Sequence, residues 1–265
     1  MTELDFIEEL LGELAETVRE RYSNRGDLEV HAKSDPNDLL TEVDLEVQTR
    51  AERRLASAFP DDHFVSEEAG LDKHPEDARS RCWIMDPIDG TSNFVRGLFP
   101  AFGISLAFAT EGEVVAGGVA IPMTGDLFLA ERGAGARRNG TPTRVSDVAS
   151  VNEARVEIDF GYPEVREATL KAVPDLILRA GGVRCHAAAV IGLCAIAAGE
   201  MDAYVHVALK PWDFAAGQLI VEEAGGRSSR LDGTRLTPLE GTAGVLASNG
   251  LVHDELVSLL VHERR

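Results

Sequence analysis

Two aspartates lie close together in residues 83–94, which read Trp-Ile-Met-Asp-Pro-Ile-Asp-Gly-Thr-Ser-Asn-Phe. Asp86 follows an apolar stretch that is typical of a strand, and Pro87 fixes the backbone angle φ and directs the chain out of that strand. Asp89 comes three residues after Asp86, so a tight turn can aim both carboxylates and the carbonyl oxygen of Ile88 at one point. Converging hard oxygen atoms are the ligands that Mg²⁺ or Mn²⁺ prefers.

The next residues indicate an anion site beside this cation site. Gly90, Thr91 and Ser92 are typical of a turn that opens a helix, whose first N–H groups are free to bind phosphate oxygens. The alternative is an Asp-Pro turn followed by an Asp-Gly turn on the surface, but the apolar stretch before them does not resemble an exposed loop. The spacing excludes an EF-hand calcium loop and the Asp-x-Asp pair of aspartyl-phosphate enzymes.

Other polar residues are candidates for the same site, although each also has an ordinary structural explanation. Asp213 precedes a stretch of small residues and can simply cap a helix. Glu67 is one of two adjacent glutamates, which alone are typical of a surface. Lys33 is followed by Thr41 and Asp44, which have the spacing of a helix capping box.

The elements that must position these residues follow from apolar periodicity and turn signals. Leu45 and Phe59 are expected to face the core from the helix expected at about 44–59. Residues 101–130 are typical of three antiparallel strands, and residues 23–38 of a polar loop. Helices are expected at 2–22, about 44–59, near 164–179, near 187–198, from about 215 and at 252–262, and strands at 64–66, 82–85, 156–160, 203–209 and 244–249.

This order predicts an α/β (α+β) protein in which residues 1–265 form one unit with two lobes. The first lobe, about 1–150, combines helices with the antiparallel meander, and the second, about 151–265, alternates strands and helices. A ligand is expected in the cleft between the lobes.

Taken together, these segments resemble the lithium-sensitive, magnesium-dependent phosphatases, which include inositol monophosphatase, fructose-1,6-bisphosphatase and nucleotide 3′-phosphatase relatives. The resemblance extends over residues 33–226, and the inositol monophosphatase branch fits best. It implies an alternating α-β-α-β-α sandwich that is commonly a homodimer. The matching segments are Glu67, Asp86-Pro-Ile-Asp89-Gly-Thr91, Gly133-Ala134-Gly135-Ala136, Asn139-Gly140 and Trp212-Asp213.

The resemblance also implies a set of metal ligands for two or three Mg²⁺ ions, with Mn²⁺ as an alternative. Glu67, Asp86 and the Ile88 carbonyl would hold one ion. Asp86, Asp89 and Asp213 would hold a second, and Glu67 would also lie near a weaker third.

The same resemblance assigns the remaining roles in a direct in-line attack of water on a phosphate monoester. Thr91, supported by Asp44, would orient the attacking water, and Lys33 would help to neutralise the charge around it. The amides of Gly90 and Thr91 would bind phosphate oxygens. With Glu67, these side chains form the expected catalytic set, and no covalent phosphoenzyme is required.

Departures from the family pattern bear on the substrate. Inositol-specific members place a glutamate seven residues before the second motif's aspartate, and this chain has His206 there. A Gly-Thr pair of the family is Ala187-Ala188 here, while Ala189 matches and would contact the substrate together with Asp89. Loss of the carboxylate removes an acceptor for vicinal hydroxyls.

A substrate that carries a second phosphate group would be compatible with His206 in place of the family's glutamate. His206, Lys210 and Arg184 are candidates for binding it, although His206 can also simply fill a strand position. The expected substrate is a small sugar or polyol phosphate, either inositol 1-phosphate or fructose 1,6-bisphosphate. Adenosine 3′,5′-bisphosphate and NADP are alternatives, as are two non-enzymatic functions: a regulatory or scaffold homologue and a cation-binding buffer protein.

Charge and composition exclude several classes of partner. The chain has 45 acidic and 26 basic residues, a formal net charge of −19, and 4 lysines (33, 73, 171 and 210) among its basic residues. Such a field repels nucleic acid and anionic membranes. The acidity also suits a halophilic protein, and an ordinary mesophile is the alternative. The five candidate site carboxylates are a small part of the 45 acidic residues, so the excess of acidic over basic residues is a surface property.

The cysteines and the apolar segments indicate a reducing, cytoplasmic setting. Cys82, Cys185 and Cys194 form no CxxC pair, and the last two are expected in the core. The acidic N-terminus does not resemble a signal peptide, and the apolar run 187–199 is too short to span a bilayer.

Overall fold

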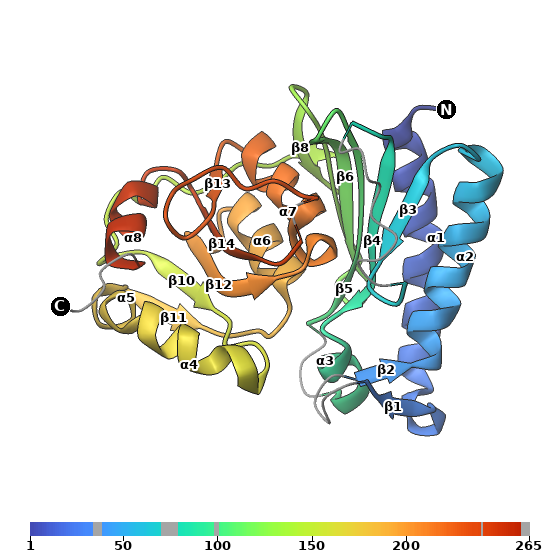
Figure 1. Cartoon of the computed structure of the whole chain (residues 1–265), viewed down its shortest axis with the longest axis horizontal. Coiled ribbons are helices and arrows are strands. Elements are labelled where there is room, and N and C mark those ends of the chain that lie inside the picture. The colour runs from blue at the N-terminus through green and yellow to red at the C-terminus, as the bar shows by residue number, and fades with distance from the viewer. Residues whose placement is uncertain (34–38, 70–78, 98–100, 240, 261–265) are drawn as a thin grey trace.

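The computed structural model describes residues 1–33, 39–69, 79–97, 101–239 and 241–260, which form five alternating layers (Figure 1). Helices α1 (Glu3–Ser23) and α2 (Glu42–Ala58) cover the outer face of the first sheet. Helices α6 (Ala189–Ala197) and α7 (Pro211–Glu223) fill the space between the two sheets. Helices α4 (Pro163–Ala172), α5 (Pro174–Arg179) and α8 (His253–Leu260) cover the outer face of the second sheet. The α-β-α-β-α order expected from the sequence is therefore confirmed.

The first sheet is a seven-stranded meander, and it confirms the antiparallel strands expected at 101–130. Its strand order follows the chain from β3 to β9, with only the β3–β4 pair parallel. The strands are β3 (His63–Ser66), β4 (Cys82–Asp89), β5 (Gly103–Thr110), β6 (Glu113–Ile121), β7 (Asp126–Glu131), β8 (Gly135–Arg138) and β9 (Thr141–Pro142).

The second sheet has the order β11-β10-β12-β14-β13 and mixes parallel with antiparallel pairs. Its strands are β10 (Arg155–Ile158), β11 (Gly182–Arg184), β12 (Ala203–Leu209), β13 (Arg227–Ser229) and β14 (Ala243–Ser248). The remaining described elements are η1 (Arg25–Asp27), β1 (Val30–Ala32), β2 (Leu39–Thr41), α3 (Thr91–Arg96), α4 (Pro163–Ala172), α5 (Pro174–Arg179) and α8 (His253–Leu260).

Small residues let the central helices pack closely. A Cβ on Gly217 of α7 would lie 2.5 Å from Leu193 of α6, and a Cβ on Gly117 of β6 would lie 3.2 Å from the Cα of Ala216 in α7. Larger side chains at these glycines would push α7 away from both neighbours. The small residues therefore hold α7, which carries Asp213, against the first sheet.

Several expectations about the helices need correction. Leu45 is 45% exposed, because it lies on the outer face of α2. The single helix expected near 164–179 is two helices, because Pro174 has no N–H to continue the first one. Helix α7 begins at Pro211 rather than near 215, since proline suits the first helical position. Cys185 is exposed, whereas Cys194 is buried as expected.

Other boundaries agree more closely. Thr2 and Asp5 form a capping box at the start of α1. The expected polar loop contains η1 and β1, and its residues 34–38 lie outside the described residues. The last helix begins at His253, and the expected end at residue 262 also lies outside them. Within the described part of the chain, no helix is both long and apolar enough to cross a membrane.

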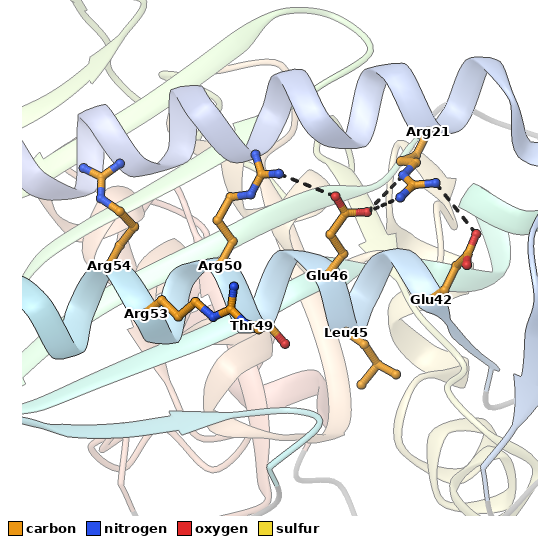
Figure 2. A pocket seen from close by; sticks show the side chains of 8 residues that line it. All are labelled: Arg21, Glu42, Leu45, Glu46, Thr49, Arg50, Arg53 and Arg54. Atoms are coloured by element: carbon orange, nitrogen blue, oxygen red, sulfur yellow. Dashed lines mark hydrogen bonds and ion pairs between the residues drawn. The ribbon is translucent and has the colours of Figure 1, made fainter.

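A hollow of about 670 Å³ lies over the α1–α2 pair, on the outer face of the molecule (Figure 2). Arginines and glutamates line it in ion pairs: Arg21 with Glu46 at 2.6 Å, and Arg50 with Glu46 at 3.5 Å. Arg54 similarly pairs with Glu9 of α1 at 2.6 Å. None of the candidate catalytic residues lines this hollow.

The acidic surface leads to a prediction about salt. If the excess of acidic side chains destabilises the folded state by mutual repulsion, screening should relieve that repulsion. We expect the melting temperature to rise when KCl increases from 0.05 to 2 M. Differential scanning calorimetry measures this, and a melting temperature that is already maximal in dilute buffer would exclude the halophilic interpretation.

Candidate active site

A bulge near the end of β4 turns Asp86 and Asp89 toward the same side. Asp86 pairs with Ser105 of β5, whereas Asp89, three residues later, pairs with Gly103, only two residues away along β5. The extra residue reverses the side-chain alternation that a regular strand would have. Asp86 is 1% exposed, and its Oδ1 accepts a hydrogen bond of 2.9 Å from the N–H of Ile88. The tight turn expected from the sequence is therefore part of a bulged strand end.

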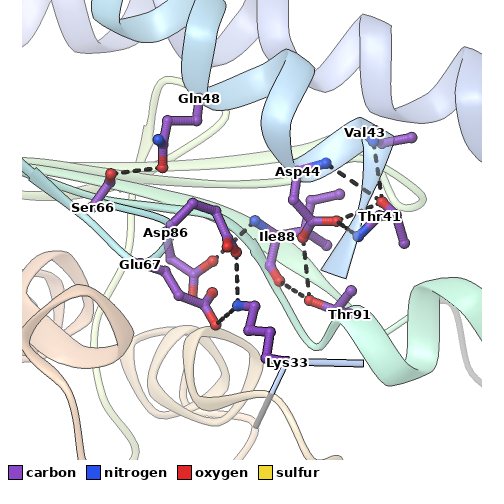
Figure 3. Close-up of polar contacts among 11 residues, drawn as sticks. Lys33, Thr41, Val43, Asp44, Gln48, Ser66, Glu67, Asp86, Ile88 and Thr91 are labelled. Atoms are coloured by element: carbon purple, nitrogen blue, oxygen red, sulfur yellow. Dashed lines mark hydrogen bonds and ion pairs between the residues drawn. The ribbon is translucent and has the colours of Figure 1, made fainter. Parts of the chain in front are cut away.

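Thr91 connects this turn to helix α2. Its Oγ1 lies 2.9 Å from the carbonyl oxygen of Ile88 and 3.3 Å from Oδ1 of Asp44. Asp44 is fully buried, and its Oδ2 accepts hydrogen bonds from the N–H of Thr41 at 2.8 Å and from the Thr41 hydroxyl at 2.5 Å. The capping box offered as the alternative explanation is present, and the same carboxylate also faces Thr91 (Figure 3).

Lys33 brings a cation to the carboxylates at the end of β3. Its Nζ donates to Oε1 of Glu67 at 2.6 Å (Figure 3) and to Oε1 of Glu68 at 2.8 Å. Burial disfavours the charged ammonium, but the charges and hydrogen bonds of the two glutamates outweigh burial and raise the pKa of Lys33. Glu68 is a member of the cluster to which the sequence pattern assigned no role.

Asp213 reaches the cluster from the central helical layer. It lies in the first turn of α7, and its Oδ2 accepts a hydrogen bond of 2.8 Å from the backbone N–H three residues earlier. Ser105 of β5 donates to the carbonyl oxygen of Trp212 at 2.6 Å, which fixes this turn against the sheet. Asp89 accepts a hydrogen bond of 2.7 Å from the N–H of Val190 in α6. Both central helices therefore begin at the cluster.

The carboxylates carry more negative charge than their surroundings compensate. Burial, followed by the charges of Glu67, Asp89 and Asp213, raises the pKa of Asp86 well above its ordinary value. Burial and the charge of Asp213 do the same for Asp89. Burial and the charge of Glu67 raise the pKa of Asp213 to about 8. A bound cation would relieve this repulsion.

The donor set fits a hard divalent cation, although its side chains are engaged elsewhere. In the described ranges, no three His, Cys, Asp or Glu side chains already converge closely enough to hold an ion. Asp86 and Asp89 bind backbone N–H groups, and Glu67 binds the ammonium of Lys33. Carboxylate and carbonyl oxygens are nonetheless the hard ligands that Mg²⁺ takes. Rotation of these side chains away from their present partners would free them.

Gly90 is required by both its conformation and its neighbours. Its φ is +87°, in the left-handed region. A Cβ there would lie 3.0 Å from the carbonyl oxygen of Ala101 and 3.1 Å from the Cβ of Ala188. Any larger residue in the turn that leads into α3 would therefore be strained and crowded.

Replacing Gly90 with alanine should impair both stability and substrate binding. We expect the free energy of unfolding to fall by about 1–3 kcal/mol because of backbone strain, and KM for a phosphate ester to rise. Gly133 is a matched control, because its φ is +78° and a Cβ there meets nothing within 4 Å. Gly133→Ala should lose stability but keep its KM. Denaturant melts and steady-state kinetics measure both, and an unchanged KM in Gly90→Ala would contradict the assignment.

The candidate substrate residues His206, Lys210 and Arg184 each have a different hydrogen-bond partner. His206 is 5% exposed, and its Nδ1 accepts a hydrogen bond of 3.0 Å from the N–H of Ala208. Burial lowers the pKa of His206, which favours the neutral ring. Lys210 Nζ donates to Thr242 at 2.8 Å, and Arg184 donates to the carbonyl oxygen of the preceding residue at 2.9 Å. Among the described residues, no hydrogen bond or ion pair joins the three. Ala189, another candidate substrate residue, is the first residue of α6 and precedes Val190.

A buried carboxylate that the sequence pattern did not single out holds the segment before α6. Glu157 of β10 is fully buried. Its Oε1 accepts a hydrogen bond of 3.1 Å from the backbone N–H of His186, and its Oε2 lies 2.8 Å from Nδ1 of the same residue. The carbonyl oxygen of His186 accepts a hydrogen bond of 2.7 Å from Asn93 of α3. This chain of contacts positions Ala187 and Ala188 against the Gly90 turn. The only signal in the sequence was a charged residue within an apolar strand.

Comparisons with known proteins find relatives that match most of the chain. The fructose-1,6-bisphosphatase/inositol-1-monophosphatase of Thermotoga maritima is 35% identical over 260 residues, which cover 98% of this chain and 96% of that protein. The Nus factor SuhB of Vibrio cholerae is 36% identical over 191 residues, which cover 71% and 70%.

Solved structures have the same fold. The Thermotoga maritima IMPase superposes with a TM-score of 0.86 at 35% identity, covering 98% of this chain and 97% of that one. A structure described as an IMPase/NADP phosphatase complexed with Mg²⁺ and phosphate has a TM-score of 0.83 at 25% identity, covering 99% and 98%. The profile of the inositol monophosphatase family matches residues 2–265. The chain belongs to the inositol monophosphatase family.

Proposed function

We propose that this protein is a Mg²⁺-dependent phosphomonoesterase that acts on a small sugar or polyol phosphate such as inositol 1-phosphate or fructose 1,6-bisphosphate. The observation that carries the proposal is the burial of Asp86, Asp89 and Asp213 close to one another and to Glu67: burial, reinforced by the charges of the neighbouring carboxylates, raises the pKa values of the three aspartates. Membership of a phosphatase family and a structural neighbour that holds Mg²⁺ and phosphate support it.

These four carboxylates, with the Ile88 carbonyl, are the proposed metal ligands. Bound there, Mg²⁺ would lower the pKa of a water molecule and offset the charge of the phosphate ester. Two ions, or three with a weaker site near Glu67, are the proposed number, and Mn²⁺ is the proposed substitute. Lys33, whose ammonium donates to Glu67 at 2.6 Å, would limit the negative charge that the substrate meets.

Thr91 and Asp44 are the proposed path for the proton of the attacking water. Thr91 Oγ1 donates to either Ile88 O or Asp44 Oδ1, which leaves its lone pairs free to accept a proton from water. Burial raises the pKa of Asp44 to about 6, although the hydrogen bonds from Thr41 oppose it. Such a carboxylate is a suitable proton acceptor near neutral pH. The amides of Gly90 and Thr91 are the proposed donors to phosphate oxygens.

A phosphate-release panel tests the activity and its substrate. The panel contains inositol 1-phosphate, fructose 1,6-bisphosphate, NADP and adenosine 3′,5′-bisphosphate, each with Mg²⁺ and with a chelator. We expect Mg²⁺-dependent release from one of the first two and much slower release from the nucleotides. No release from any of the four with Mg²⁺ would overturn the proposal.

A homodimer is proposed for the active form, and sedimentation analysis tests it.

A regulatory function is the second candidate, because a relative at 36% identity is named a Nus factor. The complete set of Glu67, Asp86, Asp89, Thr91 and Asp213 favours catalysis, since a purely regulatory protein has no need of it. Saturable Mg²⁺ binding without any phosphate release would favour the regulatory function.

A further inference from the structure

A buried carboxylate of the second sheet holds the segment that leads into α6. Glu157 of β10 is fully buried, and His186 occupies both of its oxygens: the backbone N–H binds Oε1 at 3.1 Å, and the ring Nδ1 lies 2.8 Å from Oε2. The hydrogen bond to Glu157 raises the pKa of His186, although burial of the ring opposes this. A charged ring is the stronger partner for a carboxylate. The sheet therefore fixes both the backbone and the side chain of His186.

Helix α6 packs closely against the same carboxylate. A Cβ on Gly192 of α6 would lie 3.0 Å from Oε2 of Glu157 and 2.5 Å from the ring of Tyr204, which pairs with Glu157 in the neighbouring strand β12. A larger residue than glycine at this position would push α6 away from the sheet. Glu157 therefore contacts the helix as well as the segment before it.

The residue that follows His186 has a strained backbone. Ala187 has a φ of +57°, in the left-handed region that residues other than glycine rarely adopt. Strained conformations persist where the surrounding structure fixes the chain, and they are concentrated at functional sites. Here Glu157 fixes the chain before Ala187. After it, the carbonyl oxygen of Ala188 accepts a hydrogen bond of 3.2 Å from the N–H of Ile191 at the start of α6.

Two contacts connect this segment to the candidate active site. The carbonyl oxygen of His186 accepts a hydrogen bond of 2.7 Å from the side-chain amide of Asn93. Asn93 lies in α3, the helix that follows the Gly90 turn. At the start of α6, the N–H of Val190 donates to Oδ2 of Asp89 at 2.7 Å. The second lobe therefore meets the first at a turn proposed to bind phosphate and at a proposed metal ligand.

We propose that Glu157 and His186 are positioning residues, which hold the start of α6 so that Val190 orients the carboxylate of Asp89 for metal binding. The proposal rests on the proposed function in taking Asp89 as a metal ligand. Neither positioning residue has to touch the substrate or the metal. Loss of the groups that orient a metal ligand typically weakens metal affinity by about 10–100-fold. Breaking this pair should therefore be visible in the affinity for Mg²⁺.

Two variants of Glu157 test the proposal. Glu157→Leu fills the buried position but cannot bind His186, whereas the amide of Glu157→Gln can accept from the N–H and donate to Nδ1. In Glu157→Leu we expect the Mg²⁺ dissociation constant, measured by isothermal titration calorimetry, to rise at least about tenfold. Hydrogen exchange of residues 187–193, measured by mass spectrometry without metal, should also become faster. In Glu157→Gln both quantities should stay close to those of the parent protein.

Asp202→Leu is the matched control, because Asp202 is a buried carboxylate that follows α6 rather than preceding it. It is 2% exposed, and its Oδ2 accepts a hydrogen bond of 2.6 Å from the N–H of Arg155 in β10. We expect this variant to lose thermal stability but to keep the Mg²⁺ affinity and the hydrogen exchange of residues 187–193. Equal weakening of Mg²⁺ binding in Asp202→Leu and Glu157→Leu would overturn the proposal, since any loss of packing would then have the same effect.

The outcomes separate the positioning role from the proposed function. Parent-like Mg²⁺ affinity and exchange in a folded Glu157→Leu would refute the positioning role, whatever the parent protein hydrolyses. Absence of Mg²⁺-dependent phosphate release by the parent protein would refute the proposed function instead. If Glu157→Leu does not fold, Asn93→Ala breaks the same chain of contacts from the side of α3. Faster exchange of residues 187–193 and weaker Mg²⁺ binding are expected there too, and parent-like values of both would refute the positioning role.

Discussion

Asp86→Asn should abolish phosphate release while leaving the protein folded and, without metal, more stable. The substitution removes a proposed metal ligand, so we expect kcat/KM to fall by at least about 10³-fold. It also removes a buried carboxylate whose pKa is raised by burial and by Glu67, Asp89 and Asp213. The asparagine oxygen can still accept the hydrogen bond from Ile88. The melting temperature measured in a chelator should therefore rise.

Asp126→Asn is the matched control, for which we expect the opposite effects: lower stability and unchanged phosphate release. Asp126 is also largely buried, but it forms a two-point ion pair with Arg138, at 2.8 Å for each contact. Its loss should lower the free energy of unfolding by about 1–2 kcal/mol and leave phosphate release unchanged. If Asp86→Asn were destabilised as much as Asp126→Asn, or kept near-normal activity, the assignment of Asp86 would be wrong.

The stability of the metal-free protein should fall as pH rises from about 5 to 8, and Mg²⁺ should reverse that fall. Burial raises the pKa of Asp213 to about 8 and that of Glu68 to about 7, whereas unfolded carboxyl groups titrate near 4. Between these values the folded state binds more protons than the unfolded state, so the free energy of unfolding decreases with pH. Cations compete with those protons, so Mg²⁺ should stabilise the protein more at pH 8 than at pH 6.

Calorimetry at both pH values, with a chelator or with saturating Mg²⁺, measures this effect. At 100 times its dissociation constant, Mg²⁺ should add about 2.7 kcal/mol, which raises the melting temperature by roughly 5–10 °C. Asp213→Asn should reduce both the pH dependence and the Mg²⁺ effect, because it removes a group that titrates in this window. Equal Mg²⁺ effects at pH 6 and pH 8 would contradict the proposed link between proton release and metal binding.

Much of the fold could be predicted because its signals are local. The capping box of Thr41 with Asp44 marked the start of α2, and it is present. The meander at 101–130 was also visible, since its strands alternate with turn residues. The errors arose where local patterns were ambiguous. Leu45 fits an apolar helical stripe, yet it is 45% exposed on α2.

The candidate site was predicted less completely, because contacts between distant segments leave little trace in a sequence. The motif at Asp86 and Asp89 was evident, but the bulge that turns both side chains to one side depends on the register with β5. The roles of Glu68 and Glu157 depend on Lys33 and His186, which only the packed structure brings near them. The proposed joint role of His206 with Lys210 and Arg184 has no support from their contacts, because each has a different partner.

The sequence by itself determined which chemistry is available: a set of carboxylates, one threonine and a glycine turn, spaced as in a phosphatase family. Tertiary structure alone decided how that chemistry is arranged. It places strand β4 and the starts of α2, α6 and α7 around one point, and it buries like charges there. The physical reason is that burial and charge repulsion depend on distance in space, and residues such as Asp44 and Asp213 approach one another only when the layers pack.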